Sequence, residues 1–138
     1  MQFTRLHIFL AVAALSSAPA FAWEHSFSRG LDLYSATDGR ATIRLVCDPN
    51  RVYGGTETMM LIVLGGNSDL NTNATLTFPS GETITAPLVH GRLSKRDFGD
   101  EVWQPLLDGL RNTARVELSV GANTQTVDLG EPVAFSCI

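Results

Sequence analysis

The sequence predicts an all-β fold, mainly antiparallel, forming a small β-sandwich or barrel of about seven strands with one short helix near residues 101–111. Three observations support this prediction. Apolar and polar residues alternate along most of the chain after residue 22, which is typical of strands with one buried face. Turn-forming groups that contain glycine, asparagine or proline separate these segments at short intervals. Helical periodicity is confined to a single stretch.

Residues 40–47 form the second predicted strand, after an opening segment that ends in a turn at residues 38 and 39. Alternate side chains of a strand share one face, and Ile43, Leu45 and Cys47 lie together on the apolar face of this one. We therefore expect Cys47 to point into the core.

Residues 58–64 are the most hydrophobic run after the N-terminal segment, with the sequence Thr-Met-Met-Leu-Ile-Val-Leu. This run has no polar alternation, so it predicts a central strand that is buried on both faces. Gly65 and Gly66 follow it and mark its end.

The remaining strands are predicted from the same alternation and from the turns between them. The expected segments are a hairpin of residues 74–78 and 82–88, a continuation at 89–93, a second hairpin of residues 115–120 and 124–129, and a last strand at 132–137. In the first hairpin, the candidate inward residues are Leu76, Phe78, Ile84 and Ala86.

The helical candidate lies between residues 100 and 112, where Trp103, Leu106, Leu107 and Leu110 recur at helical spacing. Proline is tolerated only in the first turn of a helix. Because Pro105 lies inside this stretch, we expect the regular helix to begin near residue 103 or 104.

The N-terminal 22 residues resemble an export signal. A short polar start containing Arg5 precedes an apolar run at residues 8–15, and Ala20-Phe21-Ala22 offers small residues for cleavage after Ala22. A membrane-spanning helix needs about 20 apolar residues, so this run is too short for one. The sequence thus predicts a cleaved signal peptide at 1–22, a single β-rich domain at 23–138 without an integral membrane segment, and a periplasmic or secreted location.

Cys47 and Cys137 are the two cysteines of the chain, and they lie 90 positions apart. An even pair in an exported protein is usually oxidised, and this spacing matches neither a redox CxxC pair nor a zinc ribbon. We therefore predict one structural disulfide that closes most of the domain.

The charge balance excludes one class of partner. The formal net charge is −4 for the whole chain, and loss of Arg5 with the signal peptide makes it −5. An acidic domain is a poor ligand for polyanions, so we expect no nucleic-acid partner.

No cofactor or metal site is expected. Outside the signal peptide the histidines are His25 and His90, which lie far apart in the sequence, and oxidised cysteines cannot join them as ligands. Residues 67–73 begin like a calcium loop, but the sixth position is Thr72 rather than glycine and the twelfth is Phe78 rather than glutamate.

The sequence also lacks a recognisable catalytic motif. The serines that follow the histidines do not lie in a glycine-flanked nucleophile turn. His90 and Ser94 are four residues apart, but that stretch has no helical character to bring them together. We therefore name no catalytic residue, and the sequence favours a protein that is not an enzyme without deciding the question.

Two patches are candidates for contact with another protein, since arginine and aromatic side chains dominate binding energy at interfaces. The predicted contact residues are Arg92, Lys95, Arg96 and Trp103 in the first patch, and Arg51 and Tyr53 in the second. The alternative is that the first patch is a solvated loop with Trp103 turned into the core.

These observations favour an exported, non-enzymatic binding or accessory protein that presents loops to another protein, for example as a subunit of a cell-envelope assembly. Two alternatives stay open. One is an inhibitor or immunity-like protein whose acidic balance suits a cationic enzyme. The other is a hydrolase with a site around His90.

Overall fold

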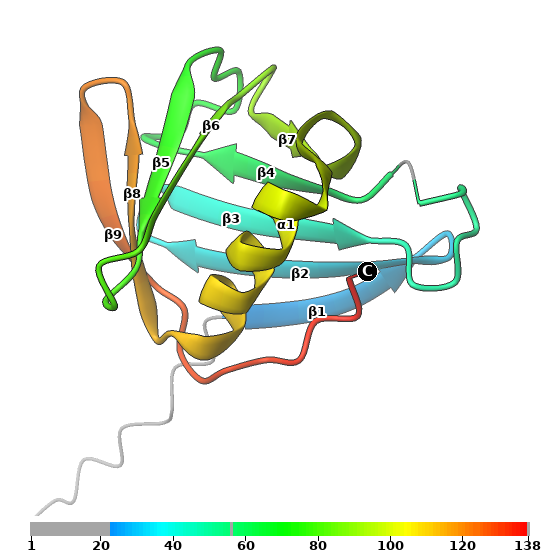
Figure 1. Cartoon of the computed structure of the whole chain (residues 1–138). Coiled ribbons are helices and arrows are strands. Elements are labelled where there is room, and N and C mark those ends of the chain that lie inside the picture. The colour runs from blue at the N-terminus through cyan, green and yellow to red at the C-terminus, as the bar shows by residue number, and fades with distance from the viewer. Residues whose placement is uncertain (1–22, 56, 138) are drawn as a thin grey trace, which may run out of the picture.

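The computed structural model of the chain describes residues 23–55 and 57–137 and shows two antiparallel sheets and one helix (Figure 1). The predicted signal peptide, residues 1–22, lies outside the described residues. The all-β sandwich prediction is confirmed, and the described part of the chain contains nine strands where the sequence predicted about seven.

The first sheet has five strands in the order β1-β2-β3-β4-β7. Its strands are β1 (Trp23–Ser28), β2 (Leu31–Asp38), β3 (Ala41–Cys47), β4 (Met59–Val63) and β7 (Arg92–Ser94). The second sheet has four strands in the order β6-β5-β8-β9. Its strands are β5 (Asn73–Thr77), β6 (Thr83–Pro87), β8 (Arg115–Val120) and β9 (Asn123–Asp128), and the helix α1 (Lys95–Asn112) connects β7 to β8.

The core lies between the two sheets and the helix. In Figure 1, α1 crosses one face of the five-stranded sheet, and the four-stranded sheet stands beside it at a steep angle. Each element contributes alternate or helically spaced apolar residues, as the sequence patterns require. The largest fully buried side chains are Trp103, Ile43, Leu45, Met60, Ile62, Leu76, Leu93, Leu106, Leu107, Leu110, Leu118 and Leu129.

The predicted disulfide is present between Cys47 and Cys137, whose side chains are buried. It joins the end of β3 to the C-terminal segment. Residues 132–137 form no strand, contrary to the sequence prediction, because their carbonyl groups are bound by a side chain rather than by a neighbouring strand. Arg111 of α1 donates hydrogen bonds from Nη2 to the carbonyl oxygens of Phe135 at 2.9 Å and Cys137 at 3.3 Å.

The helix begins earlier than predicted, at Lys95 instead of near residue 103. Gly99 interrupts it with φ 67° and ψ 175°, so residues 95–98 form a separate first turn. Pro105 is the sixth residue of the longer, second part of the helix, so it lies inside this part and removes one hydrogen bond of the helix there.

The prediction that residues 58–64 are buried on both faces is wrong for the isolated chain. Met60 and Ile62 are fully buried on the core side of β4, whereas Met59, Leu61 and Val63 are only half-buried on the other side. The helix and the second sheet cover one face of the five-stranded sheet, which leaves the other face open.

Candidate functional site

The outer face of the five-stranded sheet, on the side away from the helix, carries a group of half-buried apolar side chains among polar ones. We define the outer face by its half-buried apolar residues, which are Leu31, Leu33, Val46, Met59, Leu61 and Val63. Leu33 pairs with Val46, and Val46 pairs with Met59, so these three side chains form a continuous row across three strands. Antiparallel sheets with one solvated face normally carry polar residues at such positions.

The four-stranded sheet provides a comparison within the same molecule. The side of this sheet that faces away from the core carries mainly threonine, serine and glutamate, which alternate with buried residues such as Leu76 and Leu118. Cross-strand hydroxyl pairs join the strands, with 2.9 Å between Oγ1 of Thr75 and Thr85 and 2.8 Å between Ser119 and Thr124. This sheet has the ordinary polar surface of a strand layer in contact with water. The outer face of the five-stranded sheet has polar pairs too, such as Thr37 with Thr42 and Arg44 with Ser35, but it also carries the apolar row.

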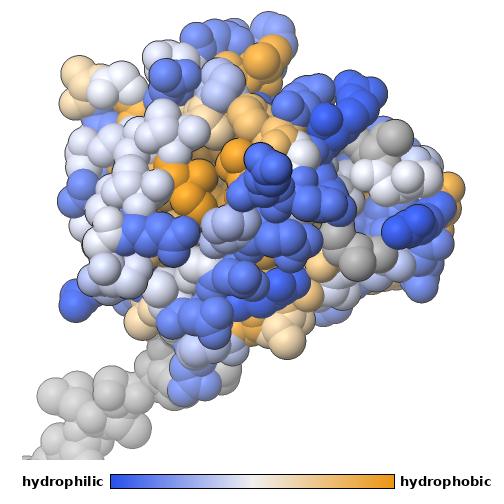
Figure 2. Space-filling model, viewed as in Figure 1, coloured by the Kyte–Doolittle hydropathy of each residue, from blue (hydrophilic) through white to orange (hydrophobic). Residues whose placement is uncertain are grey.

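The face that carries α1 is different again. Figure 2 shows a mainly hydrophilic surface there, in which hydrophobic side chains form separate patches. On the outer face, by contrast, the register places three apolar residues in one row across three strands. Contiguous apolar surface of this kind marks sites of interaction more often than scattered hydrophobic residues do.

Two hollows adjoin the outer face. The first, of about 610 Å³, is lined by Met59 together with Arg92, Arg96, Phe98 and other residues around β7. The second, of about 420 Å³, is lined by outer-face residues of β2 and by Tyr53. Glu57, two residues before β4, lines both hollows. The edges of the outer face are therefore concave, which suits the docking of a protruding partner segment.

The structure places several predicted contact residues around this surface. Arg92 and Arg96 line the first hollow and Tyr53 the second. Arg51 and Lys95 line a smaller neighbouring hollow of about 190 Å³. Arg92, Arg96 and Tyr53, which are far apart in the sequence, are thereby brought to the border of the outer face.

The charged residues of the first patch are partly paired. Lys95 Nζ lies 3.3 Å from Oδ1 of Asp100, and Arg96 Nε lies 3.7 Å from Oδ1 of Asp97. These pairs are exposed on at least one side, so they contribute little to stability. They do not prevent the side chains from contacting a partner.

Trp103 does not lie on this surface. Its side chain is 1% exposed and packs in the core with Leu106, Leu107 and Leu110 of the same helix. This is the alternative arrangement that the sequence left open, a solvated loop with the indole turned inward. Contact between Trp103 and a partner would require the core to repack.

Asp48 is a structural residue that the sequence reasoning missed. Its carboxylate, 1% exposed, accepts hydrogen bonds from the backbone N–H groups of Val52 at 2.8 Å, Tyr53 at 2.8 Å and Gly55 at 3.1 Å. Burial opposes its ionisation, but these three donors outweigh burial and hold the pKa of Asp48 below its ordinary value. The carboxylate therefore fixes the loop that carries Arg51 and Tyr53. The available signal was an aspartate directly after a strand, followed by a glycine pair.

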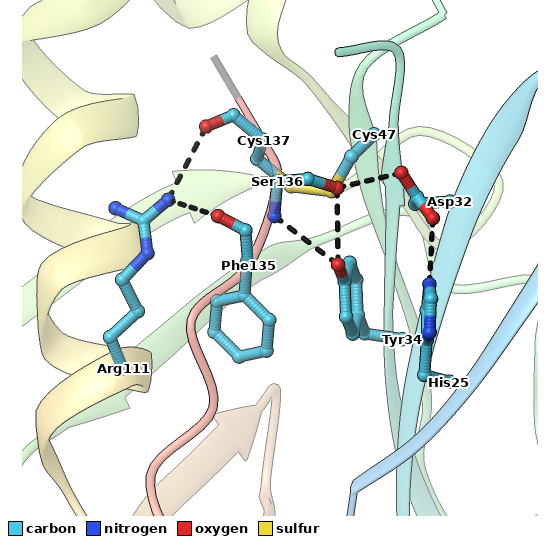
Figure 3. Close-up of a disulfide and its surroundings, with 8 residues drawn as sticks. All are labelled: His25, Asp32, Tyr34, Cys47, Arg111, Phe135, Ser136 and Cys137. Atoms are coloured by element: carbon cyan, nitrogen blue, oxygen red, sulfur yellow. Dashed lines mark hydrogen bonds and ion pairs between the residues drawn. A yellow bond between two sulfur atoms is a disulfide. The ribbon is translucent and has the colours of Figure 1, made fainter.

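A second polar cluster surrounds the disulfide (Figure 3). Asp32 accepts a hydrogen bond from His25 Nε2 at 2.6 Å and another from the Ser136 hydroxyl at 2.7 Å. Ser136 also makes a 3.1 Å hydrogen bond with the Tyr34 hydroxyl. The carboxylate stands between the imidazole and the hydroxyl. A catalytic triad requires the imidazole in the middle, so this arrangement fastens the C-terminal segment to β2.

This cluster predicts a pH dependence of stability. The Ser136 hydrogen bond and then His25 lower the pKa of Asp32 from its ordinary value of 3.8. A carboxyl group with a depressed pKa in the folded state stabilises the fold fully above pH 3.8, and this contribution is lost as pH falls through the folded-state pKa. In urea titrations at pH 7 and below pH 4, Asp32→Asn is expected to lose less stability on acidification than the unmodified protein. An identical loss in both proteins would contradict this assignment.

His90 is the centre of the hydrolase alternative. Its Nδ1 lies 2.7 Å from Oδ1 of Asp69, and His90 lines the first hollow together with Ser94. Both members of the pair are strongly exposed, at 73% and 70%. Among the described residues, no serine hydroxyl makes a hydrogen bond to the imidazole, so a nucleophile activated by His90 is missing from this arrangement.

The described residues contain no group of three or more histidine, cysteine, aspartate or glutamate side chains placed to hold a metal ion. No helix within the described ranges has the length and apolar character needed to cross a membrane. Comparisons of the chain with known protein families, with curated proteins and with solved structures found no match.

Proposed function

We propose that this chain is an exported, non-enzymatic binding or accessory protein that docks on another protein through the outer face. The observation that carries the proposal is the row formed by Leu33, Val46 and Met59 on the solvent side of an antiparallel sheet. Apolar side chains at positions where water normally selects polar ones indicate a surface that is covered during function.

The strand β4 supports the same proposal. Its sequence, Met-Met-Leu-Ile-Val, is that of a strand buried on both faces, yet the chain itself buries only the core side. A partner on the outer face would bury Met59, Leu61 and Val63 and so complete the environment that this composition suits.

The charged residues next to this row suit a specific contact. Arg44 and Arg92 lie opposite Leu61 on the two neighbouring strands, so two arginines flank an apolar position. Apolar contacts would supply binding energy, and these two arginines would select and orient the partner.

Export is part of this proposal. The buried disulfide is compatible with a periplasmic or extracellular location, because such bonds persist in oxidising compartments. N-terminal sequencing of the protein isolated from its native compartment tests cleavage after Ala22. We expect Trp23 as the first residue.

Charged substitutions at two positions of the apolar row, Leu33 and Met59, are expected to weaken partner capture strongly. Leu33→Lys with Met59→Lys introduces two charges into a surface that a partner must desolvate, and we expect recovery of the crosslinked partner to fall by at least about tenfold. The measurement is native crosslinking in the source cell envelope, followed by mass spectrometry of the purified complex.

The matched control is Thr75→Lys with Thr85→Lys on the polar face of the other sheet, which should leave capture unchanged. Thermal unfolding of both variants shows whether the fold is intact. Charge reversal of Arg92, Lys95 and Arg96 should weaken capture less than the lysine substitutions do. Undiminished capture by the folded Leu33→Lys, Met59→Lys variant would refute the outer face as the docking site.

A further inference from the structure

Among the described residues, no further strand pairs with the outer edge of β1. The other edge strand of its sheet, β7, has only three residues and leads directly into α1. In the second sheet, β6 ends in Pro87, and β9 is tied to the first sheet because Gln125 Nε2 donates to the carbonyl oxygen of Asp38 at 2.6 Å. These are common ways in which proteins blunt sheet edges. By contrast, β1 has six residues without lysine or proline, and five of them are exposed.

Phe27 makes this edge apolar. The residue is 64% exposed, although its parity is that of Trp23 and His25, which lie on the core side of the sheet. His25 stacks on Tyr34 of β2 with ring centroids 4.6 Å apart. Trp23, His25 and Phe27 therefore form a row of ring side chains on one side of β1, and the last ring, that of Phe27, is exposed to solvent.

The turn at Arg29 and Gly30 determines which backbone groups point outward. These two residues have φ values of 52° and 87° and join Ser28 to Leu31 in a two-residue hairpin. In such a hairpin, the residues flanking the turn form a hydrogen-bonded pair, and the pattern alternates along the strand. The N–H and C=O groups of Trp23, His25 and Phe27 consequently point away from β2, toward the open side.

We propose that β1 pairs with β1 of a second copy of this chain, antiparallel about a two-fold axis through Ser26. The two five-stranded sheets then form one continuous sheet across the axis. Phe27 of each copy lies opposite His25 of the other copy, and these are residues whose backbone groups point outward. The exposed phenyl ring is thereby covered by an imidazole that is already held in place by Tyr34.

Charge complementarity favours this register. The end of β1 that carries Glu24 runs beside Ser28 of the other copy and next to its Arg29, so opposite charges lie near each other on both sides of the axis. A two-fold axis through His25 places two imidazoles opposite each other and leaves Arg29 unpaired. An axis through Phe27 keeps only three paired residues before the turn. The register centred on Ser26 is therefore the best matched of the three.

This dimer is independent of the docking proposal but has a consequence for it. A two-fold axis perpendicular to the sheet leaves both outer faces on the same side of the assembly. Two docking surfaces would then lie side by side and bind a repeating or dimeric partner with increased avidity.

Sedimentation equilibrium of the oxidised protein between about 10 μM and about 1 mM tests the dimer, since a small strand-edge interface predicts dissociation in that range. We expect the average mass to rise from that of one chain toward that of two. Phe27→Pro removes an outward N–H and the apolar ring, so it should keep the protein at the mass of one chain. A constant single-chain mass of the unmodified protein at about 1 mM would overturn the proposal.

Cysteine crosslinking tests the register separately. Ser26→Cys places two thiols directly across the axis, where paired Cα atoms about 4.5 Å apart permit a disulfide. Ser28→Cys places them about four residues, or roughly 13 Å, apart along the strand. Oxidation should crosslink Ser26→Cys at least about tenfold faster than Ser28→Cys. The second variant is the matched control, because it makes the same substitution in the same strand. Equal rates would overturn this register even if a dimer forms.

Discussion

Replacement of both cysteines by serine is expected to lower the free energy of unfolding by about 4 to 5 kcal/mol. Cys47 and Cys137 are separated by 90 positions, so the disulfide closes a very long loop. On the chain-entropy description, such a crosslink acts mainly by restricting the unfolded chain, and its effect grows with loop length. Urea unfolding of the oxidised protein and of Cys47→Ser, Cys137→Ser measures the difference.

The noncovalent contacts of the C-terminal segment should preserve the fold of this variant. Arg111 still binds the carbonyl oxygens of residues 135 and 137, and Ser136 still donates to Asp32. Near-UV circular dichroism is expected to remain native in the absence of denaturant. A matched variant, Ser136→Ala, removes the hydrogen bonds of the Ser136 hydroxyl to the charged Asp32 and to Tyr34, and should cost only about 1.5 to 3 kcal/mol. A disulfide effect smaller than that of Ser136→Ala would contradict the chain-entropy argument.

The disulfide should also be inert in the native state. Cys47 is 0% exposed and Cys137 is 8% exposed, so reductants and thiol reagents reach the sulfur atoms only when the C-terminal segment detaches. Slow reduction without urea and fast reduction with it would agree with this burial.

The buried position of the disulfide was predictable from sequence, because the alternation of residues in β3 indicates which side chains face the core. Ile43, Leu45 and Cys47 share a parity, and all three are fully buried. The same alternation predicted strand character for most of β5, β6, β8 and β9. The local sequence pattern is sufficient to predict these strands, because each has one buried face and one face exposed to solvent.

The C-terminal segment shows where this reasoning fails. Phe135 and Cys137 are buried and Ser136 lies between them, so the alternation is that of a strand. A strand also requires a neighbour that supplies the ladder of hydrogen bonds. Here Arg111 supplies donors from a helix instead, and no local pattern in residues 132–137 reveals a partner 24 residues away.

The candidate site was only partly predictable for a related reason. The sequence identified Arg92, Arg96 and Tyr53 as contact residues from their chemistry, but their common location depends on how β2, β4 and β7 are placed. The apolar run at residues 58–64 was interpreted as strand burial on both sides. Sequence composition records that a face is suited to burial, and it does not record whether the chain or another molecule covers it.

Truncation of Trp103 to alanine is expected to be the most destabilising single substitution in α1, with a loss of about 3 to 5 kcal/mol. The indole is 1% exposed and fills the space between α1 and the sheet, so its removal leaves a large cavity. The result would distinguish a core residue from a partner-contact residue, because substitution of a surface contact residue changes the stability very little. Urea unfolding measures the loss, and a change below about 1 kcal/mol would contradict core burial.

Trp103→Phe is the informative companion, because it removes the indole N–H while keeping an aromatic ring in the core. Within the described residues, Nε1 of Trp103 is buried without a hydrogen-bond partner. A buried donor that is unsatisfied costs free energy, so its removal offsets part of the cavity left by the smaller ring. We therefore expect Trp103→Phe to lose only about 1 to 2 kcal/mol, far less than the alanine variant. A loss of unfolding free energy equal to that of Trp103→Ala would contradict this expectation. It would mean that the indole N–H makes a favourable polar interaction that helps α1 to pack on the sheet.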